Sequence, residues 1–312
     1  FLDRINNAGT FNTSGTSNPV TAAGTSSLGG MDLSEDYSTL YVTNLNDKLI
    51  YQVNATTGVA AATTIAIPAT GQAGGQDRPW ALKIYKGKMY VGVISDASAS
   101  QLRTDLRAFV FEYNLCTATW NPTPVVNVSM NYERGSIGNG NGQVFPNDQT
   151  RRWNPWVTSW VGNSPAVTQD ANAGNGGNAS GNYPEDKFVY AQPILSDIEF
   201  DDANAIILSF SDRTGFMGRR EAVDQNGADP GQAAFGSSYT LNGAGNLDLF
   251  SGGDIIRVGQ CTAGAWTVES NGSVCSVTTT GTLQGQGIGG GEFYWGEHAL
   301  AYGSSTSGYH RE

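Results

Sequence analysis

Three tryptophans in one short stretch are the residues whose type and spacing most directly suggest a binding surface. Trp153, Trp156 and Trp160 follow one another at intervals of three and four positions. Indole rings at that spacing, on one or two helical turns, could form a face that stacks on carbohydrate or contacts a protein partner. The same rings could instead act as a plug that buries a long loop, and the sequence leaves both interpretations open.

Two of the three cysteines could form a disulfide. Cys261 and Cys275 flank a segment typical of a strand, an Asn271-Gly272 turn and a return strand. A disulfide there would place the protein outside the cytoplasm, whereas the alternative is two unpaired small hydrophobic side chains. Cys116 is expected to be buried in its strand. The chain has no Cys-x-x-Cys pair and no histidine-rich cluster, so a structural zinc site is not expected.

The remaining charged residues do not form a recognisable catalytic arrangement. The pairs Glu35-Asp36 and Asp201-Asp202 fall in expected turns, where aspartate favours the turn itself. Asp212-Arg213 is expected to form an ion pair that fixes a loop. His298 and His310 have no serine or aspartate nearby in a nucleophile pattern, so a Ser-His-Asp hydrolase is unsupported. No catalytic residue is therefore assigned.

These residues must be positioned by short strands, because one pattern occurs three times along the chain. Each copy is an alternating strand, a polar turn and a second apolar strand, and each is followed by a third and a fourth strand. The copies cover 30–42, 80–91 and 197–208. Four-stranded units repeated along a chain are typical of the blades of a β-propeller. We therefore expect an all-β fold.

The repeat divides the chain into a single β-propeller region, 1–312, with two long glycine- and asparagine-rich insertions. Insertions of this length in compact domains are usually functional or disordered. Three recognisable blades are fewer than the four or more of a closed propeller. Either further blades have diverged, or the chain is a piece of a longer protein, and we expect the second. The blades are expected at 28–75, 78–131 and 187–272, and the insertions at 132–186 and 217–253.

Composition narrows the class of partner. The chain has 312 residues, of which 39% are hydrophobic and only 14% charged, and it contains 41 glycines. The 17 basic and 28 acidic residues give a formal net charge of −11, which argues against nucleic acid because phosphate contacts need a positive surface. No apolar run approaches the ~20 residues of a membrane span. We expect a secreted or cell-surface protein.

Three motifs carry a resemblance to known propellers. They are Arg78-Pro79-Trp80-Ala81-Leu82, Ser211-Asp212-Arg213-Thr214-Gly215 and Gly252-Gly253-Asp254-Ile255-Ile256-Arg257. The blade pattern is similar to that of the gluconolactonase-like and strictosidine-synthase-like six-bladed propellers. The motifs resemble more narrowly large bacterial surface proteins in which a propeller is followed by SdrD-B-like adhesion modules. The resemblance covers roughly 28–300, with gaps at both insertions.

The resemblance also implies a candidate metal ligand. Lactonase relatives hold a divalent cation on the propeller axis with carboxylate and amide oxygens, which suits calcium. Asp197 matches the aspartate of that set. The other two blade starts read Gly29-Gly30 and Pro79-Trp80 and supply no matching ligand. Calcium is thus the only cofactor that the resemblance suggests, with Asp197 as its one visible ligand.

Together these observations favour a non-catalytic extracellular module for adhesion, scaffolding or assembly of a filament or surface layer. Its expected partners are other copies of itself or the remainder of a longer polypeptide. Two alternatives stay open. A metal-dependent lactonase or related hydrolase would use Asp197, and a glycan-binding lectin would use Trp153, Trp156 and Trp160.

Overall fold

The computed structural model describes residues 23–132, 152–157, 186–188, 190–217, 247–249, 252–270, 273–275, 277–278 and 288. Most regular structure in these residues is β-strand. The helical segments among them are short, η2 at Arg103–Asp105 and α3 at Arg213–Met217. The prediction of an all-β chain is confirmed.

The first sheet has four antiparallel strands in chain order. Alternating apolar residues favour the strands, and polar turn residues separate them. In the first turn, the carboxylate of Asp36 accepts hydrogen bonds from the Ser34 hydroxyl at 2.6 Å and from the Ser38 amide at 3.0 Å. The strands are β1 (Leu28–Leu33), β2 (Thr39–Asn44), β3 (Leu49–Asn54) and β4 (Ile65–Ala66).

The second sheet has longer strands and a divided outer edge. β7 pairs with β6 along one side, and on its other side it pairs with β8 at one end and with β9 at the other. Two short pieces therefore take the place of a single fourth strand. The strands are β5 (Asp77–Tyr85), β6 (Lys88–Ser95), β7 (Arg107–Asn114), β8 (Thr119–Trp120) and β9 (Val126–Ser129).

The third sheet is built from two segments that are distant in sequence. Its strand order is β11-β12-β14-β15, all antiparallel, with the second insertion between β12 and β14. A disulfide joins Cys261, in β14, to Cys275, just beyond β16. The strands are β11 (Pro193–Phe200), β12 (Ile206–Asp212), β14 (Asp254–Thr262) and β15 (Ala265–Val268). Two small pairs are β10 (Asp186–Phe188) with β13 (Leu247–Leu249), and β16 (Ser273–Val274) with β17 (Val277–Thr278).

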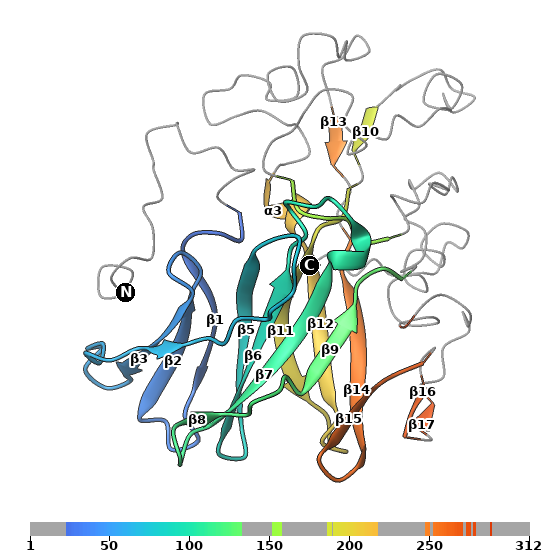
Figure 1. Cartoon of the computed structure of the whole chain (residues 1–312). Coiled ribbons are helices and arrows are strands. Elements are labelled where there is room, and N and C mark those ends of the chain that lie inside the picture. Colours follow the sequence, from blue (N-terminus) through green and yellow to red (C-terminus); the bar gives the residue numbers. More distant parts are fainter. Residues whose placement is uncertain are drawn as a thin grey trace, which may run out of the picture.

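The three sheets stack face to face, and the second lies in the middle (Figure 1). β5 packs beside both β1 and β11, so the first strands of the three sheets are neighbours. The middle sheet is buried on both faces because β6 alternates its side chains between two cores. Met89 and Val91 pack with Ile50 of the first sheet, whereas Tyr90 and Ile94 belong to the core shared with the third sheet. None of the three described sheets closes on itself.

Gly30 lets β1 approach β5 closely. A Cβ atom at this position would lie 2.8 Å from the backbone nitrogen of Leu82 and 2.9 Å from the carbonyl oxygen of Trp80. Both distances are shorter than a side-chain carbon tolerates, and both atoms are backbone. The Gly29-Gly30 pair at the beginning of β1 therefore has a packing role.

Cys116 is exposed, which corrects the expectation that it would be buried in its strand. It lies in the turn between β7 and β8. The side-chain oxygen of Asn114 accepts hydrogen bonds from the backbone nitrogens of Cys116 at 2.9 Å and Thr117 at 3.0 Å. This Asx turn ends β7 at Asn114 and directs the following residues to the surface.

Most of the two expected insertions, 132–186 and 217–253, lies outside the described residues. The described part of the first includes 152–157, with Trp153 and Trp156. Trp160, His298 and His310 also lie outside the described residues.

Candidate functional site

Asp197 lies on β11, where the pairing with β12 shifts by one residue between Leu195 and Asp197. Asp197 is exposed to solvent. Partial desolvation of the carboxylate nevertheless raises the pKa of Asp197, and the negative charges of Glu199 and Asp32 raise it further. The hydrogen bond from the Ile198 backbone and the positive charge of Lys83 act in the opposite direction. Asp197 therefore belongs to a group of interacting charges.

Lys83 is the cation of that group, which we call the Lys83 cluster: Lys83, Asp32, Asp197 and Glu199. Its Nζ lies 2.7 Å from Glu199 Oε1 and 3.8 Å from Asp32 Oδ2. Burial alone would lower the pKa of Lys83, but the hydrogen bond to Glu199 and the surrounding carboxylates raise it. The ammonium therefore stays charged and joins β5 to both neighbouring first strands.

Asp32 strengthens the same junction through the backbone. Its Oδ2 accepts a hydrogen bond from the Ile84 backbone nitrogen at 2.8 Å, and its Oδ1 accepts one from Leu33 at 2.9 Å. The carboxylate thus fixes β1 against β5, in addition to its longer contact with Lys83. Because these side chains are partly exposed, each ion pair contributes about 1 kcal/mol or less.

The sequence contains a signal for this cluster that the site predictions missed. Asp32, Lys83 and Glu199 each stand between two apolar residues in the first strand of the three copies, as Met31-Asp32-Leu33, Leu82-Lys83-Ile84 and Ile198-Glu199-Phe200. Because the first strands of the three copies are neighbours, opposite charges at these positions indicate a contact between the strands. Within the described part of the chain, no three His, Cys, Asp or Glu residues lie close enough to hold a metal ion. Asp197 as a calcium ligand stays a prediction.

Trp153 is fully buried, at 0% exposure. Its indole nitrogen donates to the hydroxyl of Tyr132 at 3.1 Å, and that hydroxyl donates to Asp254 Oδ2 at 2.6 Å. The ring lies 6.2 Å from that of Phe210. These contacts attach the segment 152–157 to β12 and β14, the two inner strands of the third sheet.

Trp156 is also buried, at 3% exposure. Its indole nitrogen donates to the carbonyl oxygen of Pro193 at 2.8 Å, and its backbone nitrogen donates to the carbonyl oxygen of Asp96 at 2.9 Å. Two guanidinium groups lie near its ring, that of Arg213 at 4.4 Å and that of Arg78 at 5.3 Å from the centroid. Cations stack favourably on indole faces, so the ring holds both arginines.

Arg213 connects four segments through this site. Its Nε donates to the carbonyl oxygen of Ala23 at 2.8 Å, and its Nη1 donates to the carbonyl oxygen of Val157 at 3.1 Å and to Gln192 Oε1 at 2.8 Å. Burial lowers the pKa of Arg213, and the positive charge of Arg78 adds to the effect. We call Trp156, Arg78, Arg213, Asp96 and Gln192 the Trp156 cluster.

The carboxylate of the neighbouring Asp212 accepts hydrogen bonds from backbone nitrogens and so has a structural role. Its Oδ1 accepts hydrogen bonds from the backbone nitrogens of Gln192 at 2.9 Å and Thr214 at 2.9 Å, and its Oδ2 accepts one from Gly252 at 3.4 Å. Arg78 Nε lies 2.7 Å from Asp96 Oδ2 at the other side of the cluster. The buried charges therefore hold loops together at the beginning of β5 and β11.

The burial of Trp153 and Trp156 limits their use as a sugar-stacking face. A sugar could stack on Trp153 or Trp156 only by displacing the contacts that bury these rings. Because Trp160 lies outside the described residues, the glycan-binding role of the three tryptophans stays a prediction.

Comparisons with known proteins do not assign the chain to a family. No protein-family model matches the chain, and no curated protein sequence matches it. In the part of the chain that the structure describes, no helix has the length and apolar character to cross a bilayer.

Proposed function

We propose that the chain is a β-propeller region that acts as a non-catalytic, extracellular module for adhesion, scaffolding or assembly. Support for the propeller comes from the order of neighbours: β5 packs between β1 and β11, and each begins a sheet of four or more strands. Blades of a propeller meet through their first strands around an axis. A calcium site at Asp197 belongs to the rival proposal of a metal-dependent lactonase.

The observation that carries the non-catalytic proposal is the ion pair between Lys83 and Glu199 across β5 and β11, at 2.7 Å. The first strands meet here, and Asp197, which matches a metal ligand of the lactonase-like propellers, lies two residues before Glu199 on β11. In this chain the Lys83 ammonium pairs with Glu199 and lies near Asp32, beside Asp197. Its charge holds the strands together and competes with a cation from solution.

An uncovered apolar strand supports the choice of an assembly role. Met31 and Leu33, on β1, are 49% and 38% exposed. They alternate with Asp32, so they face away from the second sheet. Large apolar side chains in an exposed strand favour contact with another surface. We propose that other copies of this chain, or the remainder of a longer polypeptide, pack there.

The disulfide supports an extracellular location. Cys261 and Cys275 are joined, and disulfides persist mainly in oxidising compartments. Secretion or display at the cell surface is therefore part of the proposal.

Sedimentation velocity over a range of protein concentrations tests the assembly role. The wild-type chain should self-associate, and Met31→Ser with Leu33→Ser should shift it toward the monomer. Tyr37→Ser is the matched control, since Tyr37 is 74% exposed but lies in the turn after β1. A lactone-hydrolysis assay with added calcium is run in parallel. A monomeric wild-type chain that hydrolyses lactones, with the activity lost in Asp197→Ala, would overturn the proposal.

A further inference from the structure

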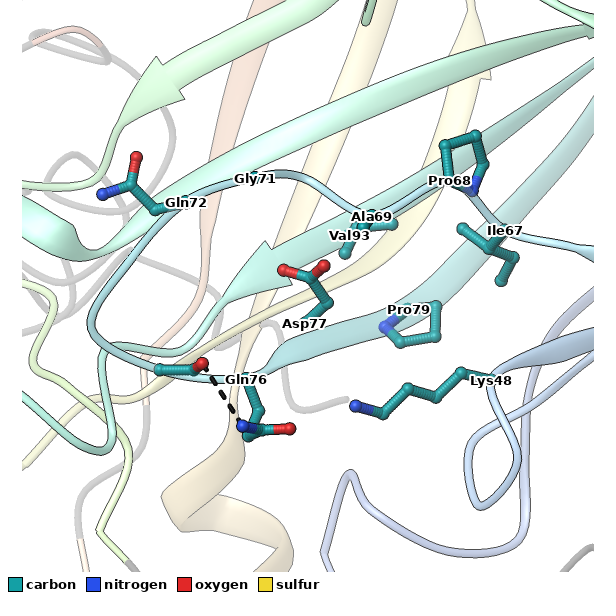
Figure 2. A pocket seen from close by; sticks show the side chains of 11 residues that line it. Lys48, Ile67, Pro68, Ala69, Gly71, Gln72, Gln76, Asp77, Pro79 and Val93 are labelled. Atoms are coloured by element: carbon teal, nitrogen blue, oxygen red, sulfur yellow. Dashed lines mark hydrogen bonds between the residues drawn. The ribbon is translucent and has the colours of Figure 1, made fainter.

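A pocket of about 440 Å³ lies between the first and second sheets. One wall is the beginning of β5, another is the loop 67–76, and the turn between β2 and β3 closes one side (Figure 2). Its volume falls within the range of pockets that hold small organic ligands. It is separate from the residues of the Lys83 cluster.

Lys48 supplies a charge to this pocket. The residue lies in the β2–β3 turn with a positive φ of 60°, and its backbone nitrogen donates to the Asn44 carbonyl oxygen at 3.0 Å. This turn fixes the position of the Lys48 Cα atom. Figure 2 shows the Lys48 side chain extending toward Gln76. Among the described residues, the Lys48 ammonium has no hydrogen bond and no ion pair.

The carboxylates near Lys48 already have partners. Asp77 accepts hydrogen bonds from the backbone nitrogen of Thr70 at 2.9 Å and from its hydroxyl at 2.5 Å. Asp96 accepts one from the Gln76 backbone nitrogen at 2.8 Å and pairs with Arg78 at 2.7 Å. Neither carboxylate lies within ion-pair distance of the Lys48 ammonium. A counter-ion that contacts Lys48 must therefore come from outside the described residues.

The pKa of Lys48 and the apolar walls of the pocket indicate what kind of ligand would fit. Burial lowers the pKa of Lys48, and the positive charge of Arg78 adds to the effect, while Asp77 and Asp96 oppose it. Ile67, Pro68, Pro79 and Val93 give the pocket an apolar side. A ligand that suits both features carries a negative group at one end and a compact apolar body at the other.

We infer that this pocket binds a small organic carboxylate, with the carboxylate on the Lys48 ammonium and the apolar body against Ile67, Pro68, Pro79 and Val93. This site is independent of the proposed assembly role, and its failure would leave that role intact.

Benzoate is a suitable probe and benzamide its neutral isostere. Binding is measured by two-dimensional NMR of the ¹⁵N-labelled chain at physiological salt, following the amides of Gly71, Gly75 and Gln76. Lys48→Met removes the charge and keeps the apolar stem. Lys86→Met is the matched control, because Lys86 also has a positive φ, 50°, in a hairpin turn but lies outside the pocket.

We expect benzoate to shift the pocket amides saturably and benzamide to bind more weakly. Lys48→Met should weaken benzoate binding by about tenfold or more, as expected for the loss of a hydrogen bond to a charged group. Lys86→Met should leave binding unchanged, and Lys48→Arg should retain it, which shows that the positive charge at this position is what matters. The inference is overturned if wild type gives no saturable shifts, if benzamide binds as tightly as benzoate, or if folded Lys48→Met binds benzoate as wild type does.

Discussion

The guanidinium of Arg213 lies 4.4 Å from the centre of the Trp156 ring, and both residues are almost completely buried. Arg213 begins α3 at the end of β12, whereas Trp156 belongs to the first insertion. The contact therefore fixes a loop segment to the third sheet. It also places a buried cation where three hydrogen-bond acceptors surround it.

The geometry of the Arg213 guanidinium should contribute more to the stability of the fold than its charge does. Arg213→Lys keeps the charge but cannot reach all three acceptors, so we expect a loss of about 2 kcal/mol or more in the free energy of unfolding. Urea unfolding followed by circular dichroism measures it. Arg107→Lys is the control, because Arg107 Nε donates a hydrogen bond to the exposed Asn127 at the outer edge of the second sheet. Equal losses in the two variants would contradict a special role for Arg213.

Gly30→Ala should destabilise the stacking of the first two sheets. The added methyl group would meet backbone atoms of β5, which cannot rotate away, and overpacking of this kind costs about 1–3 kcal/mol. Thermal or urea unfolding measures the loss.

Gly92→Ala provides the comparison for Gly30→Ala. A methyl group at Gly92 would lie 2.6 Å from the side chain of Leu195. Leu195→Ala should therefore cost less in the Gly92→Ala background than in the wild-type chain, and a double-mutant cycle measures that difference. If Gly30→Ala were as stable as wild type, the close approach of β1 to β5 would be wrong.

Asp197→Asn should stabilise the chain slightly at neutral pH. The pKa of Asp197 is raised in the folded state, so the folded chain holds this proton more tightly than the unfolded chain. Its contribution to stability is therefore present at pH values below the ordinary pKa and is lost as the pH rises through the raised value. The asparagine variant avoids that loss, by less than about 1 kcal/mol because the carboxylate is exposed.

The test is the pH dependence of thermal unfolding for both chains. The gain from Asp197→Asn should disappear below the ordinary pKa of an aspartate, 3.8. A loss of stability at neutral pH that calcium reverses in wild type, but not in Asp197→Asn, would instead support the metal-ligand hypothesis.

Asp36 should show the opposite pH dependence. Hydrogen bonds from the Ser34 hydroxyl, the Ser38 backbone and the Ser38 hydroxyl lower the pKa of Asp36 from its ordinary value of 3.8 to about 2. The stabilisation is complete above the ordinary value and is lost as the pH falls toward about 2. An NMR titration of the Asp36 carboxyl measures the shift directly. Ser34→Ala should move the pKa back toward 3.8, and an unchanged pKa in that variant would contradict the assignment.

Removing the disulfide should weaken the third sheet. Cys261 and Cys275 are 14 positions apart, and closing a loop of that length stabilises a fold by about 3 kcal/mol in the chain-entropy description. The double variant Cys261→Ser and Cys275→Ser should lose roughly that amount in urea unfolding. Cys116→Ser is the control, since Cys116 is free and exposed, and it should leave the unfolding midpoint unchanged. A double variant as stable as wild type would contradict the bond's contribution.

The sequence by itself determined the strands and many of the turns. Leu49–Asn54 follows the first copy of the pattern, where a third strand is predicted, and β3 has those bounds. Residues near Asp36 and Asp201 predict turns, and both carboxylates accept backbone hydrogen bonds in turns. These features follow from local physics, because side-chain period and Asx turns depend on residues only a few positions apart.

The tertiary structure alone decided which side chains meet. Lys83 pairs with Glu199 although they are 116 positions apart, and Trp156 is buried because Arg78, Arg213 and Pro193 surround it. From the sequence, Trp153 and Trp156 could form either an exposed binding face or a buried plug. The sequence also predicted that Cys116 is buried, whereas it is exposed. The burial of the two tryptophans and the Lys83–Glu199 pair depend on which sheets stack on one another, and that is set by packing between distant segments. The exposure of Cys116 instead follows from the local Asx turn at Asn114.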